Sequence, residues 1–230
     1  MVENLDRLQN SNRYRKLNFK EVQTFFNLID LKFLLKTGFF SKQKTILDIG
    51  CGFGFIPFEF KQRYNVKAYG VDIINPLNDI FIDGENSKLK KKAETIIKNI
   101  NFIEKDILSL KVSDVNNNKF DFIYSFRTFM YLKYDTRLEL VKNLYDNFLK
   151  IGGTMLIDLS GSSSKNNLTE QDLFEDYSIF KDSNGEFFDG FSVKEVSFMN
   201  DFKVSFVSNI LIIKKKRKNL FSFKVGGNKK

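Results

Sequence analysis

The stretch Leu47-Asp48-Ile49-Gly50-Cys51-Gly52-Phe53-Gly54 decides how the rest of this sequence is interpreted. The apolar run Thr45–Ile49 predicts a buried strand, and the residues that follow predict a helix from about Phe55 to Tyr64. Between them, three glycines let the backbone turn tightly and approach a ligand at a distance that a Cβ would prevent. Such a turn places a ligand at a helix N-terminus, beside the carboxyl ends of the strands, where open α/β sheets bind.

Two acidic residues accompany the glycine turn. Asp48 lies two positions before Gly50, and Asp72 follows a second predicted strand, Val66–Val71, about 20 residues past the first glycine. A carboxylate at that place can accept hydrogen bonds from both hydroxyl groups of a ribose. The G-x-G-x-G spacing differs from the G-x-G-x-x-G of dinucleotide folds, because Phe55 stands where those folds have their last glycine. The pattern therefore predicts a ribose-containing ligand and disfavours a nicotinamide-dependent oxidoreductase.

The rest of the chain alternates between predicted strands and helices, which indicates a parallel α/β sheet. The further strands are expected at Asn101–Ile107, Phe120–Phe126 and Thr154–Leu159, and the further helices at 19–36, Glu85–Lys98 and Asp135–Lys150. The last of these helices is expected to end at Gly152-Gly153. Residues Phe191–Lys216 are typical of strands, with Asn200-Asp201 or Ser208-Asn209 as alternative hairpin turns.

The composition excludes several kinds of chemistry. The chain has 230 residues, no histidine and one cysteine. It therefore cannot use a Ser-His-Asp triad or a histidine-ligated metal, and Cys51 cannot form an intramolecular disulfide or a CxxC metal site. We expect no metal site. The lack of a signal peptide or of a long apolar run predicts a cytoplasmic protein without a membrane span.

The positive charge is concentrated at the C-terminus. The whole chain carries a net charge of +9, and residues 214–230 hold eight lysines and arginines with no acid among them. Subtracting these eight leaves +1 for residues 1–213. A basic run such as Lys214–Lys218 can bind the phosphate backbone of RNA or an anionic membrane surface, or it can simply keep the protein in solution.

These motifs resemble those of the class I S-adenosylmethionine-dependent methyltransferases. Leu47–Gly54 fits the first motif of that family and Gly70–Ile73 the second, and Asn101–Ile107, Phe120–Phe126 and Leu149–Thr154 are similar to later elements. The resemblance covers residues 44–160. It implies a Rossmann-like three-layer sandwich with a mostly parallel seven-stranded sheet and a C-terminal antiparallel hairpin. It also implies a methyltransferase domain at 44–213, preceded by a helical extension at 1–43 that packs on the domain, and followed by a basic tail at 214–230. Residues 160–190 are a candidate acceptor lid.

The resemblance implies a cofactor, S-adenosyl-L-methionine, and a set of residues to bind it. The Gly50–Gly54 turn would contact the methionine part, Asp48 its amino group and Asp72 its ribose. Ile73 would contact the adenine face, and Asp106 and Ile107 the adenine edge. The complete predicted set is Asp48, Gly50, Cys51, Gly52, Gly54, Asp72, Ile73, Asp106, Ile107 and Tyr124.

The methyl acceptor is less well marked. The stretch Tyr124–Tyr131 lacks the Pro-Pro-Tyr that enzymes methylating adenine or glutamine carry there, and Cys51 lies in the wrong place for a cytosine C5 nucleophile. Arg127 and Tyr131 are the candidate acceptor contacts, and no general base is assigned. The leading hypothesis is in-line transfer to an O or N atom of a small molecule. The alternatives are an RNA methyltransferase that uses Lys214–Lys218 and a non-catalytic binding module. The sequence does not predict the oligomeric state.

Overall fold

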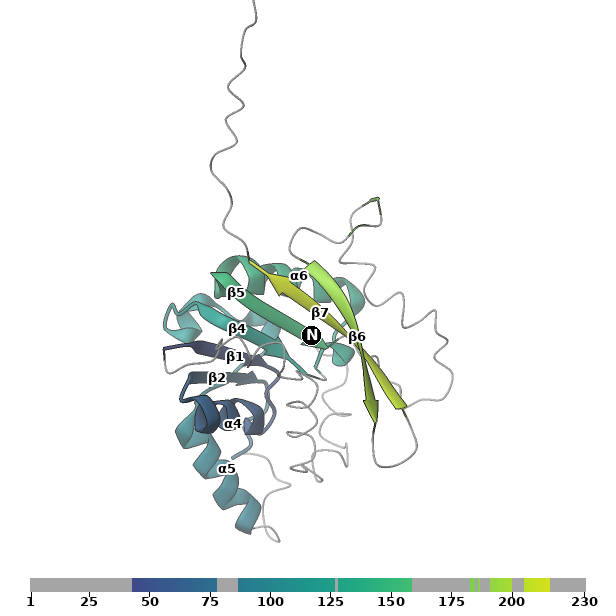
Figure 1. Ribbon diagram of the computed structural model, residues 1–230. Coiled ribbons are helices and arrows are strands. Elements are labelled where there is room, and N and C mark those ends of the chain that lie inside the picture. Colours follow the sequence, from purple (N-terminus) through teal and green to yellow (C-terminus); the bar gives the residue numbers. More distant parts are fainter. Residues whose placement is uncertain are drawn as a thin grey trace, which may run out of the picture.

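The computed structural model describes residues 43–77, 87–126, 128–158, 183–184, 186, 191–199 and 205–215 (Figure 1). Several predictions fall outside these residues. They are the N-terminal extension, Arg127, almost all of the candidate lid, and the basic tail beyond Lys215.

The described residues form a seven-stranded sheet with the order β3-β2-β1-β4-β5-β7-β6. The strands are β1 (Thr45–Ile49), β2 (Lys67–Asp72), β3 (Asn101–Glu104), β4 (Phe120–Ser125), β5 (Leu149–Asp158), β6 (Phe191–Met199) and β7 (Ser205–Lys214). Strands β1 to β5 are parallel, whereas β7 runs antiparallel to both β5 and β6. This confirms the predicted α/β class, with a mostly parallel sheet and a C-terminal antiparallel hairpin.

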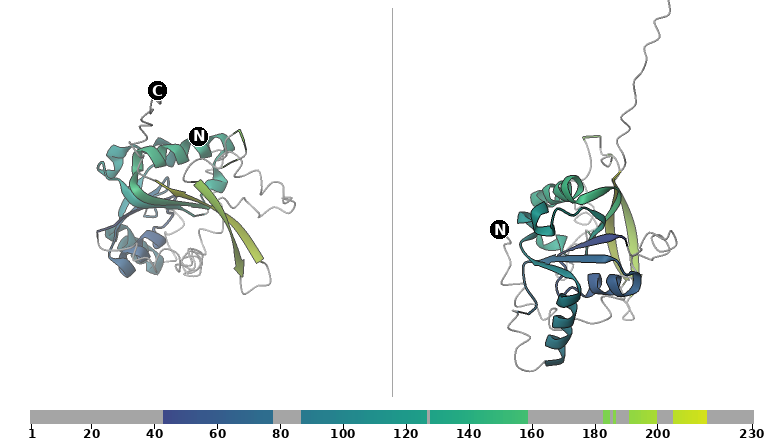
Figure 2. Two further views of the ribbon diagram at one scale, coloured as in Figure 1. Left: turned by 45° about the horizontal axis from the view of Figure 1, so that its top comes forward. Right: turned by 90° about the vertical axis from the view of Figure 1, so that its left-hand side faces the viewer.

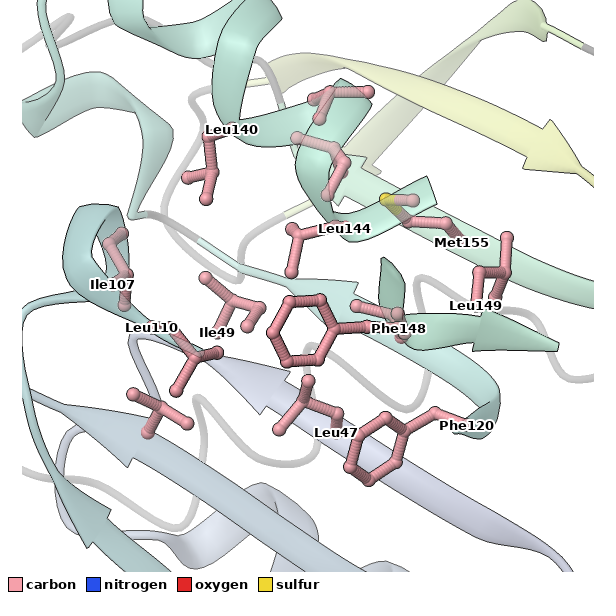
Figure 3. Close-up of a cluster of buried hydrophobic side chains, with 14 of the residues drawn as sticks. Leu47, Ile49, Ile107, Leu110, Phe120, Leu140, Leu144, Phe148, Leu149 and Met155 are labelled. Atoms are coloured by element: carbon pink, nitrogen blue, oxygen red, sulfur yellow. The ribbon is translucent and has the colours of Figure 1, made fainter. Parts of the chain in front are cut away.

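Helices cover both faces of the sheet, giving three layers (Figure 2). On one face, α4 (Phe55–Tyr64) and α5 (Ser87–Asn99) pack through Phe60 and Ile96 against Ile46 of β1. On the other face, α6 (Tyr134–Asn143) and the π-helical turn η5 (Leu144–Phe148) pack against Leu47 and Ile49 (Figure 3). Neighbouring residues of β1 thus serve opposite cores, as the alternation of a strand requires. None of the helices in the described ranges is long and apolar enough to cross a membrane.

The predicted helix Asp135–Lys150 is wrong at its C-terminal end. Helix α6 stops at Asn143, η5 follows, and β5 already begins at Leu149. Leu149 pairs with Phe120, but the next pair on the two strands is Thr154 with Phe122, so β5 bulges between them. Gly152, with φ 81°, allows this bulge. The two glycines therefore belong to the strand, which starts earlier than the predicted Thr154.

Other boundaries also differ from prediction. Strand β3 ends at Glu104, because Asp106 caps the 3₁₀ turn η2 (Ile107–Ser109) by accepting a hydrogen bond from the Leu108 N–H at 2.9 Å. Met199 of β6 pairs with Ser205 of β7, and the predicted turn Asn200-Asp201 lies outside the described residues. Ser208-Asn209 is wrong as a turn, since both residues pair with β6 inside β7.

Candidate functional site

The glycine turn joins the carboxyl end of β1 to the N-terminus of α4. Gly50, Gly52 and Gly54 all have positive φ, at 75°, 54° and 72°. The backbone N–H groups of Gly50 and Cys51 both donate to the carbonyl of Val71 on β2, at 2.8 and 3.0 Å. An L side chain is strained at such φ values, so these positions favour glycine. The turn is thereby held above the boundary between β1 and β2.

Two of these glycines differ in what surrounds them. A Cβ on Gly50 would lie 2.1 Å from the Oγ1 of Thr128, so the protein itself fills that space. A Cβ on Gly52 would meet no atom within 4 Å. Gly52 therefore borders open space, where a ligand can approach the backbone closely.

Asp72 fixes the same turn from the end of β2. Its Oδ2 accepts from the Gly52 N–H at 2.7 Å and its Oδ1 from the Ile74 N–H at 3.1 Å. Burial raises the pKa of Asp72, while the backbone N–H groups of Ile74, Gly52 and Ile73 oppose that rise. A carboxylate offers about four acceptor positions. The carboxylate therefore keeps acceptor capacity beyond the bonds from Gly52 and Ile74.

Asp48 is a buried carboxyl group beneath the turn. Only 2% of Asp48 is exposed, and it lies on β1 between Gly70 of β2 and Tyr124 of β4. Burial raises its pKa well above the usual range, and the Tyr124 hydroxyl opposes the rise. Its Oδ2 accepts no hydrogen bond from the part of the chain that the structure describes. A buried oxygen that accepts no hydrogen bond lowers the stability of the folded protein, so Oδ2 is suited to accept a hydrogen bond from a ligand.

Cys51 and Tyr124 serve the packing of this region. The Cys51 sulfur fits against Gly70, where a Cβ would lie 2.7 Å from Sγ, and burial raises the thiol pKa well above its ordinary value. Cys51 is therefore poorly suited to act as a nucleophile. Tyr124 is fully buried, and its ring lies 5.5 Å from that of Phe60 on α4.

The remaining predicted residues lie at the same edge of the sheet. Ile73 directly follows Asp72, and the Asp72 carbonyl accepts from the Lys105 N–H at 2.8 Å, which joins the end of β2 to the segment holding Asp106. The Asp106 carboxylate caps η2, and Ile107 is buried in the core. Tyr131 is half-buried at the end of the 3₁₀ turn η4 (Phe129–Tyr131), after β4.

Two hydroxyl residues that the sequence analysis missed also hold the turn. The Ser125 hydroxyl, at the end of β4, donates to the Ile49 carbonyl at 2.9 Å, and the Thr128 hydroxyl donates to the Gly50 carbonyl at 3.2 Å. They tie the segment after β4 to the glycine turn. The available signal was their place at the end of, and just after, the predicted strand Phe120–Phe126.

A separate cavity of about 420 Å³ lies at the sheet edge formed by β3. Its walls include Tyr69, Asn75, Phe102 and Glu104. None of the predicted cofactor residues lines it, so we do not connect it with the glycine turn.

Comparison with known proteins identifies the family. Residues 40–223 match the family model described as a methyltransferase domain. The chain belongs to this family. Among curated proteins, it is 28% identical over 123 residues to two rice proteins, from Oryza sativa subspecies indica and japonica, named "Probable protein arginine N-methyltransferase 3". That match covers 50% of this chain, and the chain spans only 20% of the length of those relatives.

Solved methyltransferase structures share the fold over almost the whole chain. The N-methyltransferase NodS from Bradyrhizobium japonicum, in complex with S-adenosyl-L-homocysteine, gives a TM-score of 0.55 at 14% identity and covers 94% of this chain and 98% of its own. Magnesium protoporphyrin IX methyltransferase from Synechocystis, with S-adenosylhomocysteine bound, gives 0.54 at 15% identity and covers 92% and 95%. At these identities the likeness establishes the fold of the methyltransferase domain.

Proposed function

We propose that this methyltransferase-domain protein transfers a methyl group from S-adenosyl-L-methionine to an oxygen or nitrogen atom of a small molecule. The observation that carries the proposal is the glycine turn at the carboxyl edge of the sheet. Gly52 borders open space there, and its N–H donates to the buried carboxyl group of Asp72. Family membership supports methyl transfer, and the cofactor product bound to NodS supports the choice of cofactor.

The residues present fit this cofactor. The Asp48 Oδ2 lacks a donor among the described residues, and an ammonium group supplies one. Asp72 keeps acceptor capacity for the ribose hydroxyl groups beyond its bonds to Gly52 and Ile74. Ile73 offers an apolar surface for the adenine ring. Asp106 uses one oxygen to cap η2, and the other can accept from the adenine amino group.

The sulfonium centre of the cofactor supplies an electrophilic methyl group. The protein then contributes mainly position, by holding the two reactants in line, which is worth several orders of magnitude in rate. The rigid turn serves this purpose, because Ser125 and Thr128 fix the carbonyls of Ile49 and Gly50. Arg127 and Tyr131 remain the proposed acceptor contacts. An acceptor that attacks through a lone pair needs no early proton removal, so the lack of histidine is compatible with the reaction.

A small acceptor fits the structure better than an RNA held by Lys214–Lys218. Lys214 ends β7 beside the amino end of β5, whereas the glycine turn follows the carboxyl end of β1. A strand of five residues separates these edges by about 16 Å. The division of the chain into an extension at 1–43, a methyltransferase domain at 44–213 with a lid at 160–190, and a tail at 214–230 remains part of the proposal.

Calorimetric titration of the purified protein tests the proposal. S-adenosylmethionine and S-adenosylhomocysteine should bind with micromolar affinity, and NADH should not bind. Preferential binding of NADH would refute the cofactor assignment. If neither sulfur compound binds, the protein is a non-catalytic member of the family. Once binding is established, a screen of labelled methyl transfer to amines, phenols and carboxylates identifies the acceptor, with a short RNA as the competing substrate.

A further inference from the structure

The cavity beside β3 has a chemical character that differs from the rest of the protein. Its volume of about 420 Å³ lies within the range of small-molecule sites, about 300–1,000 Å³. Of the ten described residues that line it, half are apolar or aromatic and half are acids or asparagines, and none is a lysine or arginine. The chain as a whole has 37 lysines and arginines and a net charge of +9. The described lining is therefore acidic against a basic background, which favours a cationic ligand.

Strand β3 brings an aromatic ring and a carboxylate of this lining to the same face of the sheet. Phe102 packs against the core cluster that contains Ile96 of α5 and Ile100, so its side chain lies on the α5 side. Residues i and i+2 of a strand share a face, so Glu104 lies on that side too, about 7 Å further along the strand. Ile97 and Ile100 also line the cavity and make its wall on the α5 side apolar.

An amide, and not a cation, holds the Glu104 carboxylate. Its Oε2 accepts a hydrogen bond from the Asn75 side-chain Nδ2 at 3.0 Å. Asn75 is fixed in turn, because its Oδ1 accepts from the Leu77 N–H at 3.0 Å. Within the described ranges, no lysine or arginine forms an ion pair with Glu104. The carboxylate is thus oriented through one oxygen, and Oε1 keeps its capacity to accept from a ligand.

The other acid of the lining is already matched by a lysine. Asp114, in the 3₁₀ turn η3 (Val112–Val115), pairs with Lys105 at 2.7 Å. The negative charge left for a ligand is therefore that of Glu104. A metal ion would need several oxygen ligands together, and the described residues contain no group of three or more metal-binding side chains. An organic cation with an apolar part fits the combination of one carboxylate and apolar walls better.

We propose that this cavity binds a small arylalkylamine. The ammonium group donates a charge-assisted hydrogen bond to Oε1 of Glu104, and the ring packs against Phe102, Ile97 and Ile100. The spacing of about 7 Å between Phe102 and Glu104 along β3 suits an ammonium group joined to a ring by two carbon atoms. None of the predicted cofactor residues lines the cavity, so this ligand is distinct from the cofactor.

Calorimetric titration of the full chain with 2-phenylethylamine tests this proposal without any measurement of methyl transfer. The control ligands are the neutral 2-phenylethanol and the anionic 3-phenylpropionate, which carry the same ring on a chain of similar length. Glu104→Gln keeps the size of the side chain and removes its charge, and Phe102→Leu keeps an apolar side chain and removes the ring. The matched control is Glu139→Gln, because Glu139 is also an exposed glutamate but lies on α6 and not in the described lining. Thermal melts confirm that the variants fold.

The amine should bind saturably, the alcohol about fivefold more weakly, and the anion not at all. Glu104→Gln should lower the affinity for the amine about fivefold, the effect of losing one exposed ion pair, and Phe102→Leu about threefold, whereas Glu139→Gln should leave it unchanged.

Three results would overturn the proposal: no saturable binding of the amine, equal binding of the alcohol, or an unchanged affinity in Glu104→Gln. Saturating S-adenosylhomocysteine should leave amine binding intact. Competition between the two would place the amine at the glycine turn and would also overturn the proposal. If S-adenosylhomocysteine itself does not bind, the proposed function fails, and the amine titrations still decide the question of the cavity.

Discussion

Replacement of Gly52 by valine separates the role of the glycine turn in ligand binding from its role in folding. The new side chain would enter the open space beside Gly52 and meet no protein atom within 4 Å of its Cβ. Its cost to folding is therefore mainly the positive φ of 54°, or about 1–2 kcal/mol. In the proposed site the cofactor occupies the same space. We expect the affinity for S-adenosylhomocysteine to fall at least 100-fold, which corresponds to about 2.7 kcal/mol.

Gly152 provides the matched control for this experiment. It also has positive φ, at 81°, and a Cβ there would also meet no atom within 4 Å, but it lies in the β5 bulge at the opposite edge of the sheet. Gly152→Val should lower the unfolding free energy by a similar amount and leave cofactor affinity unchanged. Calorimetric titration gives both affinities, and thermal melts give the stabilities. If the two variants bind equally well, Gly52 does not border the cofactor and the site assignment fails.

Substitutions at three further positions test the groups around the turn. Asp48→Asn should raise the unfolding free energy at neutral pH, because burial raises the pKa of Asp48 and penalises its ionised form. The gain should vanish below about pH 4, where the folded and unfolded forms are both protonated, and cofactor affinity should fall, as melts and titrations over pH will measure. Asp72→Ala removes the acceptor of the Gly52 N–H and should cost about 1.5–3 kcal/mol of cofactor binding; unchanged affinity would contradict its placement. Thr128→Val keeps the shape of the side chain but loses the hydrogen bond to the Gly50 carbonyl, so it should weaken cofactor binding about fivefold. Thr128→Ser keeps the hydroxyl and should restore the affinity. Equal affinities of the two variants would mean that Thr128 acts only by packing.

Local sequence was sufficient for the part of the fold that positions the turn. Strand β1 and helix α4 occur at the predicted residues, because an apolar run, three glycines and a helical pattern follow one another without interruption. The junction between α6 and β5 was mispredicted for the opposite reason. Gly152-Gly153 looks like a helix end, but Leu149 is fully buried beside Phe120, and only the pairing of β4 with β5 reveals that the strand has already begun.

In the candidate site, too, residues from one short stretch of sequence could be predicted, whereas contacts between distant residues could not. The sequence motif predicted Asp48, the glycines and Asp72 as cofactor contacts, all from the single stretch 48–72. It gave no sign that Ser125 and Thr128 would hold the turn, since these bonds join residues 76 and 78 positions apart. Such contacts depend on β4 lying next to β1, which follows from the topology of the sheet and not from any short stretch of sequence.

One rule of parallel sheets accounts for the separation of the acids from the lysines in this protein. Parallel strands bring all their carboxyl ends to one edge, where the chain places glycines and acids, and all their amino ends to the other, where it places lysines. The distance between the edges is about 16 Å, so a ligand at the glycine turn and a contact at the opposite edge would occupy separate places on the protein.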